Sequence, residues 1–436
     1  MTLTKPNLIK LLVPLVAFVA TLFAIRSLDG SPGREAAAPG VPAAGFDDTR
    51  SADRRIASLQ AAVARGTDRS APYAALGDAY LQKARETFDP RFYARAETAL
   101  REALARDRRD ATALTAMGAL ANARHDFAAG LRFGERARAA APGVAKPYGV
   151  IVDALVELGR YGQAERALQR MVDLKPNLDS YARVSYFREL HGDVAGAVEA
   201  MRLAASAGGD ARENFAYVQT LLGNLELARG AVPAARDAYR LALSRYPRYA
   251  PAEGGLARAE AAAADLSAAI RRLRRLVARP LPEYALALAE AELAEGRRAV
   301  AREHLALVDA QHRLELRSGA SADAGMAVFE ADHGNRERAV ALARMVWRAA
   351  PSVSAADALG WALTRAGAAA EGLVYAQRAL RLGSRDPLFL YHAGIAARDA
   401  GRPGLARRHL ESALTAGPRF SPYHAPRARA ALADLR

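Results

Sequence analysis

Cysteine is absent from this 436-residue sequence, and lysine and aromatic residues are scarce. Without cysteine the chain has no disulfide, no thiolate metal ligand, no cysteine nucleophile and no acylated cysteine. Aromatic residues make up 7%, and lysine occurs only at Lys5, Lys10, Lys83, Lys146 and Lys175. Alanine, leucine and arginine dominate instead. Because these are good helix formers, the composition predicts an all-α protein with closely packed helices.

Catalytic motifs are missing as well. The sequence contains no phosphate-binding loop, no G-x-S-x-G and no H-E-x-x-H. Acidic residues are spread along the expected helix surfaces, where they pair readily with the many arginines. We therefore expect no enzymatic activity and no cofactor.

The formal net charge is +15, carried mostly by arginine. An excess of positive charge can indicate that a protein binds nucleic acid, anionic lipid or an acidic partner. Here the arginines are dispersed along the chain, which favours a compositional origin such as a GC-rich genome. We expect no nucleic-acid partner.

An apolar run lies near the N-terminus. Residues 8–25 contain one charge, Lys10, and Arg26 follows them. Such a run is long enough to enter a membrane if Lys10 turns its amine to the interface. The positive charge on its N-terminal side predicts that this end stays in the cytoplasm and that the remainder is extracytoplasmic, periplasmic or at the cell surface. The residues that follow make a poor cleavage site for a signal peptidase, so we expect residues 1–26 to form an uncleaved signal anchor. The alternative is that the segment is cleaved and the protein is secreted.

A repeated spacing covers most of the remaining chain. A small residue precedes a proline by twelve positions in five places, and each pair frames a helix that the proline closes. In four places a glycine precedes such a small residue by a further twelve positions. The first pattern is Gly130 to Pro142, Ala164 to Pro176, Ala235 to Pro247, Ala339 to Pro351 and Ala406 to Pro418, and the second starts at Gly118, Gly223, Gly360 and Gly394, the third of which leads to Gly372.

These offsets resemble those of the tetratricopeptide (TPR) repeat. The first-helix signature of that family, W-x2-L-G-x2-Y, is matched by Tyr73-Ala-Ala-Leu76-Gly77-Asp-Ala-Tyr80, with tyrosine in place of tryptophan. The resemblance implies a bacterial, membrane-anchored or exported TPR protein. Its fold class would be an all-α TPR-like solenoid, a right-handed superhelix of helix hairpins, behind an N-terminal signal-anchor helix.

The predicted organisation has five parts. About ten repeats occupy residues 70–424, between capping helices at 51–69 and 425–436 that hide the terminal apolar faces. A flexible tether rich in glycine, proline and alanine, residues 27–50, joins this array to the signal anchor or signal peptide at 1–26.

The resemblance also predicts the binding site, because first helices line the concave groove in this family and exposed residues there grip peptides. Tyrosine and arginine concentrate binding energy in buried contacts. The sequence shows no carboxylate clamp of paired lysine and asparagine. We expect a protein or peptide partner to be held by these groove candidates: Asp153, Arg183, Tyr186, Tyr217, Asn224 and Tyr391.

Two alternatives remain open. The cluster Arg271–Arg275 suggests an electrostatic binder of anionic polymer or lipid, although it lacks the interleaved aromatics of single-strand binders. A metal or small-molecule binding protein is the other alternative, at the irregular junction near residues 299–335. His304 and His312 share a helix face there, but two helical turns, about 12 Å, separate them, which is too far for one ion.

Overall fold

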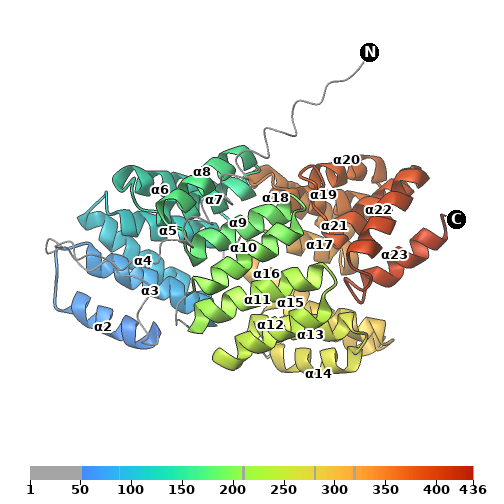
Figure 1. Cartoon of the computed structure of the whole chain (residues 1–436), viewed down its shortest axis with the longest axis horizontal. Coiled ribbons are helices and arrows are strands. Elements are labelled where there is room, and N and C mark those ends of the chain that lie inside the picture. Colours follow the sequence, from blue (N-terminus) through green and yellow to red (C-terminus); the bar gives the residue numbers. More distant parts are fainter. Residues whose placement is uncertain (1–51, 88, 209–211, 279–280, 318–320, 436) are drawn as a thin grey trace, which may run out of the picture. The chain divides into compact units, whose positions relative to one another are not determined.

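The computed structural model describes residues 52–435, apart from residues 88, 209–211, 279–280 and 318–320. Within these residues the chain forms 22 α-helices and no strand. The helices follow one another as antiparallel neighbours joined by short turns (Figure 1).

Ten hairpins, each a first and a second helix, lie between one helix at either end. The single helices are α2 (Ala52–Ala64) and α23 (His424–Ala433). The hairpins are α3 (Ala71–Thr87) with α4 (Arg91–Arg106), α5 (Ala111–Ala123) with α6 (Phe127–Ala140), α7 (Lys146–Glu157) with α8 (Tyr161–Leu174), α9 (Leu178–Leu190) with α10 (Val194–Ser206), α11 (Arg212–Ala228) with α12 (Val232–Arg245), α13 (Ala250–Ala262) with α14 (Leu266–Leu276), α15 (Pro282–Ala294) with α16 (Arg298–Arg317), α17 (Ala324–His333) with α18 (Arg336–Ala349), α19 (Val353–Arg365) with α20 (Ala369–Ala379), and α21 (Pro387–Asp399) with α22 (Pro403–Ala416).

The repeated small residues let the two helices of a hairpin approach closely. A Cβ added to Gly77 of α3 would lie 2.5 Å from Leu100 Cδ2 of α4, and one added to Gly223 of α11 would lie 2.5 Å from Tyr239 Cε1 of α12. Leu100 and Tyr239 are fully buried as a result. Larger side chains at these glycines would force the helices apart, which is the physical basis of the spacing in the sequence.

The end helices cover the terminal hairpins. On α2, Ile56 is buried against the first hairpin, with Leu59 and Val63 packed beside it. On α23, Ala428 and Ala431 are buried against the core of the last hairpins. Each end helix therefore shields an apolar face that would otherwise meet water.

The predicted anchor (1–26) and tether (27–50) lie outside the described residues. In the part of the chain that is described, no helix combines the length and the apolar character needed to cross a membrane.

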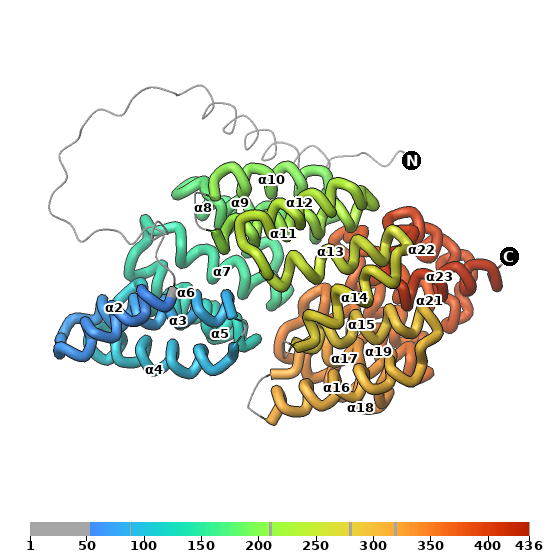
Figure 2. Tube along the Cα trace, turned by 90° about the horizontal axis from the view of Figure 1, so that it is seen from below, coloured from blue at the N-terminus to red at the C-terminus, as the bar shows by residue number. Residues whose placement is uncertain are grey.

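The array curves until distant hairpins meet. Figure 2 shows the trace running from α2–α6 on one side, across α7–α13, to α14–α23 on the other. Where α8 begins, the hydroxyl of Tyr161 accepts a hydrogen bond of 2.8 Å from the backbone N–H of Val353 in α19. The Arg381 guanidinium lies 5.3 Å from the centre of the Tyr161 ring. The middle of the array thus touches its C-terminal part across 192 positions of sequence.

Two glycine turns make this closing contact possible. Gly159 and Gly192 end the first-helix segments of their hairpins with φ of +68° and +75°, a conformation that side chains rarely adopt. A Cβ on Gly159 would also strike the carbonyl oxygen of Pro351, and one on Gly192 would strike that of Gly383. Glycine is required at both turns for backbone conformation and for close approach.

Candidate partner-binding cavity

The first helices surround a cavity of about 1220 Å³, which we call the inner cavity. Its wall comes mainly from α3, α5, α7, α9 and α11, with further residues from α17, α18 and the start of α19. Five of the six groove candidates from the sequence lie together in this wall: Asp153, Arg183, Tyr186, Tyr217 and Asn224.

Tyr391, the sixth candidate, lies elsewhere. It is only 4% exposed and packs against Trp361, Phe420 and His424, with ring centroids 5.6, 6.1 and 5.3 Å away. Almost every residue of α21 from Leu390 onward is buried, so the sequence pattern does not reveal which face meets the cavity and which meets the next hairpin. Tyr391 is a core residue.

Arg183 and Asp153 form a bidentate ion pair between α9 and α7. Arg183 Nε and Nη2 donate to the two Asp153 oxygens at 2.8 and 2.7 Å, and Nη1 donates to the Asp179 carbonyl at 3.0 Å. Burial alone would lower the pKa of Arg183, but the Asp153 carboxylate raises it well above its usual value. The guanidinium is therefore permanently charged and already occupied by the protein's own acceptors.

Two tyrosines present their rings to the inner cavity. Tyr186 and Tyr217 are 42% and 43% exposed, which places them among the exposed large hydrophobic residues of the described part of the chain. Surrounding protein raises the pKa of both hydroxyl groups through burial, and at Tyr186 the negative charges of Glu157 and Glu189 raise it further. These rings are neutral, rigid and available for contact.

Asn224 is held in place at the cavity wall. Its Oδ1 accepts hydrogen bonds from the Tyr239 hydroxyl at 2.8 Å and from Arg258 Nη2 at 2.7 Å. Tyr239 lies on α12 of the same hairpin as Asn224, and Arg258 lies on α13 of the next hairpin. The side chain thus fixes the wall, and its amide NH₂ is the group that remains to meet a ligand.

Several carboxylates in the wall were not among the predicted residues. Burial raises the pKa of Glu157 and Glu213, and burial together with Asp386 raises the pKa of Glu189 to about 7. Glu157 and Glu189 both lie in the last turn of a first helix, a few residues before the turn glycine. This repeated position is the only signal for the two glutamates in the sequence. Because glutamate is common in the last turn of surface helices, the signal does not identify a site.

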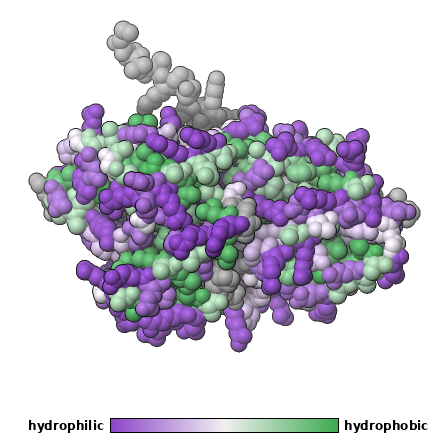
Figure 3. Space-filling model, turned by 180° about the vertical axis from the view of Figure 1, so that it is seen from behind, coloured by the Kyte–Doolittle hydropathy of each residue, from purple (hydrophilic) through white to green (hydrophobic). Residues whose placement is uncertain are grey.

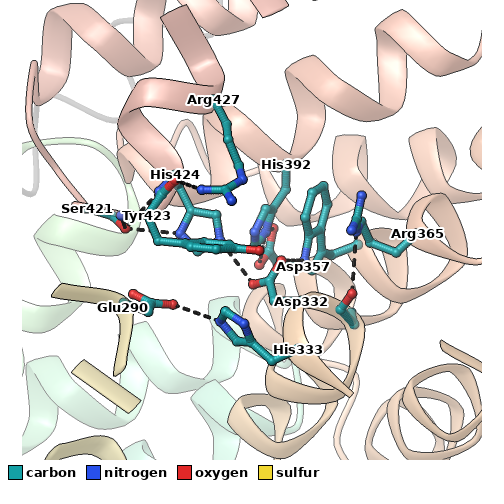
Figure 4. Close-up of polar contacts among 12 residues, drawn as sticks. Glu290, Asp332, His333, Asp357, Arg365, His392, Ser421, Tyr423, His424 and Arg427 are labelled. Atoms are coloured by element: carbon teal, nitrogen blue, oxygen red, sulfur yellow. Dashed lines mark hydrogen bonds and ion pairs between the residues drawn. The ribbon is translucent and has the colours of Figure 1, made fainter. Parts of the chain in front are cut away.

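A second cluster of polar groups joins α17, α19, α21 and α23 (Figure 4). Asp332 accepts a hydrogen bond from Trp361 Nε1 at 3.1 Å and lies 3.0 Å from His424 Nε2. Asp357 lies 2.9 Å from His392 Nδ1. Burial alone would raise the pKa of Asp332, but the contact with His424 lowers it below its usual value. The cluster fastens the C-terminal helix to the last hairpins.

Ser421, His424 and Asp332 stand in the order of a catalytic triad. Ser421 Oγ is 3.1 Å from His424 Nδ1. The same oxygen, however, accepts the backbone N–H groups of Tyr423 at 3.1 Å and of His424 at 3.0 Å. The lone pairs of this hydroxyl are therefore used by the turn that leads into α23, which gives Ser421 a structural role there.

The histidines of the possible metal site contact other residues of the protein itself. His304 Nδ1 lies 2.8 Å from Glu292, and buried His312 packs edge-on against Phe329 at 5.2 Å. No group of three or more potential metal ligands converges within the described residues.

The basic cluster at residues 271–275 is partly neutralised. Arg272 pairs with Glu260 at 2.7 Å and also with Glu253, and Arg274 pairs with Glu292 at 3.2 Å. Hydrophilic residues are spread widely over the face seen in Figure 3, with hydrophobic patches between them.

No family model and no curated protein matches the sequence. Solved structures do. A human IFIT1 dimer with m7Gppp-AAAA is 14% identical over 76% of this chain and 76% of that chain, with a TM-score of 0.50. A thermophilic TPR protein of Thermus thermophilus is 20% identical over 42% of this chain and 98% of that chain, with a TM-score of 0.37. Cut9–Hcn1 of the APC/C is 15% identical over 88% of this chain and 81% of that chain, with a TM-score of 0.38.

At this identity the likeness to IFIT1 concerns the fold. The described part of the chain is an all-helical, TPR-like solenoid, and the predicted fold class is confirmed to that extent. The signal-anchor helix of the same prediction falls outside the described residues.

Proposed function

We propose that this protein is a non-enzymatic scaffold that holds a segment of a partner protein in its inner cavity. The observation that carries the proposal is a cavity of about 1220 Å³ whose wall presents two exposed tyrosines, Tyr186 and Tyr217, from adjacent first helices. Exposed aromatic rings on a rigid wall offer contact area at little entropic cost, which is typical of peptide-binding surfaces.

The charge of the cavity favours protein over nucleic acid. Its lining includes seven carboxylates (Asp78, Asp153, Glu157, Asp179, Glu189, Glu213 and Asp323) and three cations (Arg85, Lys146 and Arg183), so the formal balance is 3 − 7 = −4. An anionic ligand such as the m7Gppp-AAAA of IFIT1 would be repelled by this wall. The excess positive charge of the chain lies outside the cavity.

Membrane attachment is part of the proposal. Residues 8–25 would anchor the chain with the repeats on the extracytoplasmic side of a bacterial membrane, periplasmic or at the cell surface. Protease added to spheroplasts should then degrade the repeat array. Protection in intact cells and spheroplasts alike would contradict this location.

The partner is tested by cross-linking capture with the full-length chain in its own cells. The double variant Tyr186→Ala, Tyr217→Ala should bind specific partners at least about a hundredfold less tightly, since each tyrosine removed from a buried contact costs about 2 kcal/mol. Leu241→Ala is the matched control, because Leu241 is 47% exposed on α12 and is not part of the cavity wall. Equal recovery by both variants would contradict the cavity as the binding site.

A further inference from the structure

We infer that the partner segment is basic, and that one of its lysine or arginine side chains enters the corner of the inner cavity formed by Glu157, Tyr186 and Glu189. The inference rests on the proposed function and specifies its ligand. It departs from the acidic C-terminal peptides that a carboxylate clamp would select.

Two of the three cations of the cavity wall, Lys146 and Arg183, are held in ion pairs. Lys146 Nζ lies 3.1 Å from Asp78, and Arg183 is paired with Asp153 as described above. Arg85 donates a hydrogen bond to Gln82. A basic ligand therefore meets one wall cation without an ion pair to a described residue, Arg85, whereas several carboxylates of the wall remain incompletely neutralised.

Glu157 and Glu189 are two wall carboxylates whose pKa is raised and on which no cation of the described residues acts. Neither makes an ion pair with any described residue; Glu157 accepts a hydrogen bond from Ser352, and Glu189 faces the negative charge of Asp386. Desolvated carboxylates without a counter-charge are costly, and the raised pKa of each reports that cost. An incoming ammonium or guanidinium group would remove it.

Tyr186 completes the corner. All three side chains line the same cavity: Tyr186 and Glu189 are three positions apart on α9 and so share a helix face, and Glu157 ends the preceding first helix, α7. Tyr186 as a whole residue is 42% exposed. A cation beside two carboxylates and over a tyrosine ring gains Coulomb and cation–π attraction at once. The arrangement suits a lysine or arginine side chain better than a neutral one.

The whole chain and the wall of the inner cavity carry charges of opposite sign. With a net charge of +15, the protein repels basic peptides in general. Attraction of a basic segment must therefore come from a local acidic region, and the wall of the inner cavity, at −4, is such a region with room for a peptide.

The test is fluorescence anisotropy with the full-length chain and short labelled peptides of alternating lysine and alanine. The same peptide with acetylated lysines and one with glutamate in place of lysine serve as probes of charge. We expect only the lysine peptide to bind. Glu157→Gln and Glu189→Gln should each weaken binding about tenfold, the loss expected for one charge-assisted hydrogen bond. Glu199→Gln, at an exposed position of α10 outside the cavity, should leave binding unchanged.

Three results would overturn the inference: no binding of the lysine peptide, equal binding of the acetylated peptide, or equal weakening by Glu199→Gln. Spermine is included as a competitor, because displacement by spermine at equal charge concentration would assign the corner to polyamines instead of a protein segment. The capture experiment with Tyr186→Ala, Tyr217→Ala is independent of ligand charge. If that variant loses its partners while the lysine peptide fails to bind, the scaffold stands and only the basic ligand is wrong.

Discussion

Two sets of first-helix glutamates differ in what surrounds them. In α11, α13, α15 and α17 a buried glutamate meets an arginine in every case: Glu226 with Arg202, Glu260 with Arg272, Glu292 with Arg274, and Glu330 with Arg338. In α7 and α9, Glu157 and Glu189 face the inner cavity and form no ion pair with a described residue.

The difference separates architecture from recognition. The paired glutamates join neighbouring helices, as Glu292 of α15 reaches back to Arg274 of α14, and their charges are satisfied within the fold. A buried charge that lacked its partner would destabilise the array, so these positions have no freedom to serve a ligand. The cavity glutamates have no arginine partner of their own among the described residues and lie where a ligand has room to enter.

The largest expected effect contrasts a core tyrosine with a cavity tyrosine. Tyr391→Ala should lower the free energy of unfolding by about 4 kcal/mol, because it opens a cavity beside Trp361 and His424. Tyr186→Ala should cost less than about 1 kcal/mol, since the ring borders open space. Urea unfolding followed by circular dichroism measures both. Similar midpoints for the two variants would erase the distinction between core and cavity wall.

The next effect breaks one paired glutamate. Arg272→Met should destabilise the fold by about 2 kcal/mol, because Glu260 and Glu253 both lose their cation. Arg271→Met, on the neighbouring position of α14 and without a carboxylate partner among the described residues, should change stability by less than about 0.5 kcal/mol. A shift in urea midpoint of the same size for both variants would show that the pairing is not what matters.

The sequence predicted the hairpins because their cause is local. Gly77 opposite Leu100 and Gly223 opposite Tyr239 act within one hairpin, so the spacing of small and large residues reveals the contact. Placing candidates on first helices brought five residues to one cavity, whereas Tyr391 failed because α21 is buried on nearly all faces.

The closing of the array could not be predicted in the same way. The contact between Tyr161 and Val353 depends on small rotations summed over many hairpins, and no local pattern encodes that sum. Glu157 and Glu189 become distinctive only once curvature has enclosed them, because a carboxylate's burial and the absence of a counter-charge are properties of the assembled wall.

A smaller effect concerns the pH dependence of stability. In the fold the pKa of Glu189 is raised to about 7, above its value in the unfolded chain, so the folded state binds the proton more tightly. Its contribution is fully favourable below the unfolded pKa and is lost as the pH rises through about 7. Glu189→Gln should therefore stabilise the protein at about pH 8, by on the order of 2 kcal/mol once solvent access is allowed for, and far less at about pH 4.

Urea midpoints of both proteins at the two pH values test this prediction. Glu199→Gln serves as the control because its carboxylate is exposed on α10. A gain from Glu189→Gln that is equal at the two pH values would mean that the carboxylate is not the source of the pH dependence.

The smallest effect links the same proton to ligand binding. Lysine stays protonated between about pH 6 and pH 8, whereas Glu189, with its pKa raised to about 7 by burial and by Asp386, changes from mostly neutral to mostly ionised. Affinity for the lysine peptide should rise about fivefold across that interval, and Glu189→Gln should abolish the rise. The paired Glu260 offers the contrast: because Arg272 already holds it and it lies outside the cavity wall, Glu260→Gln should leave the pH profile of binding as it is in the unaltered protein. Retention of the full rise in Glu189→Gln would assign the titrating group elsewhere and remove the reason for treating the two sets of glutamates as functionally different.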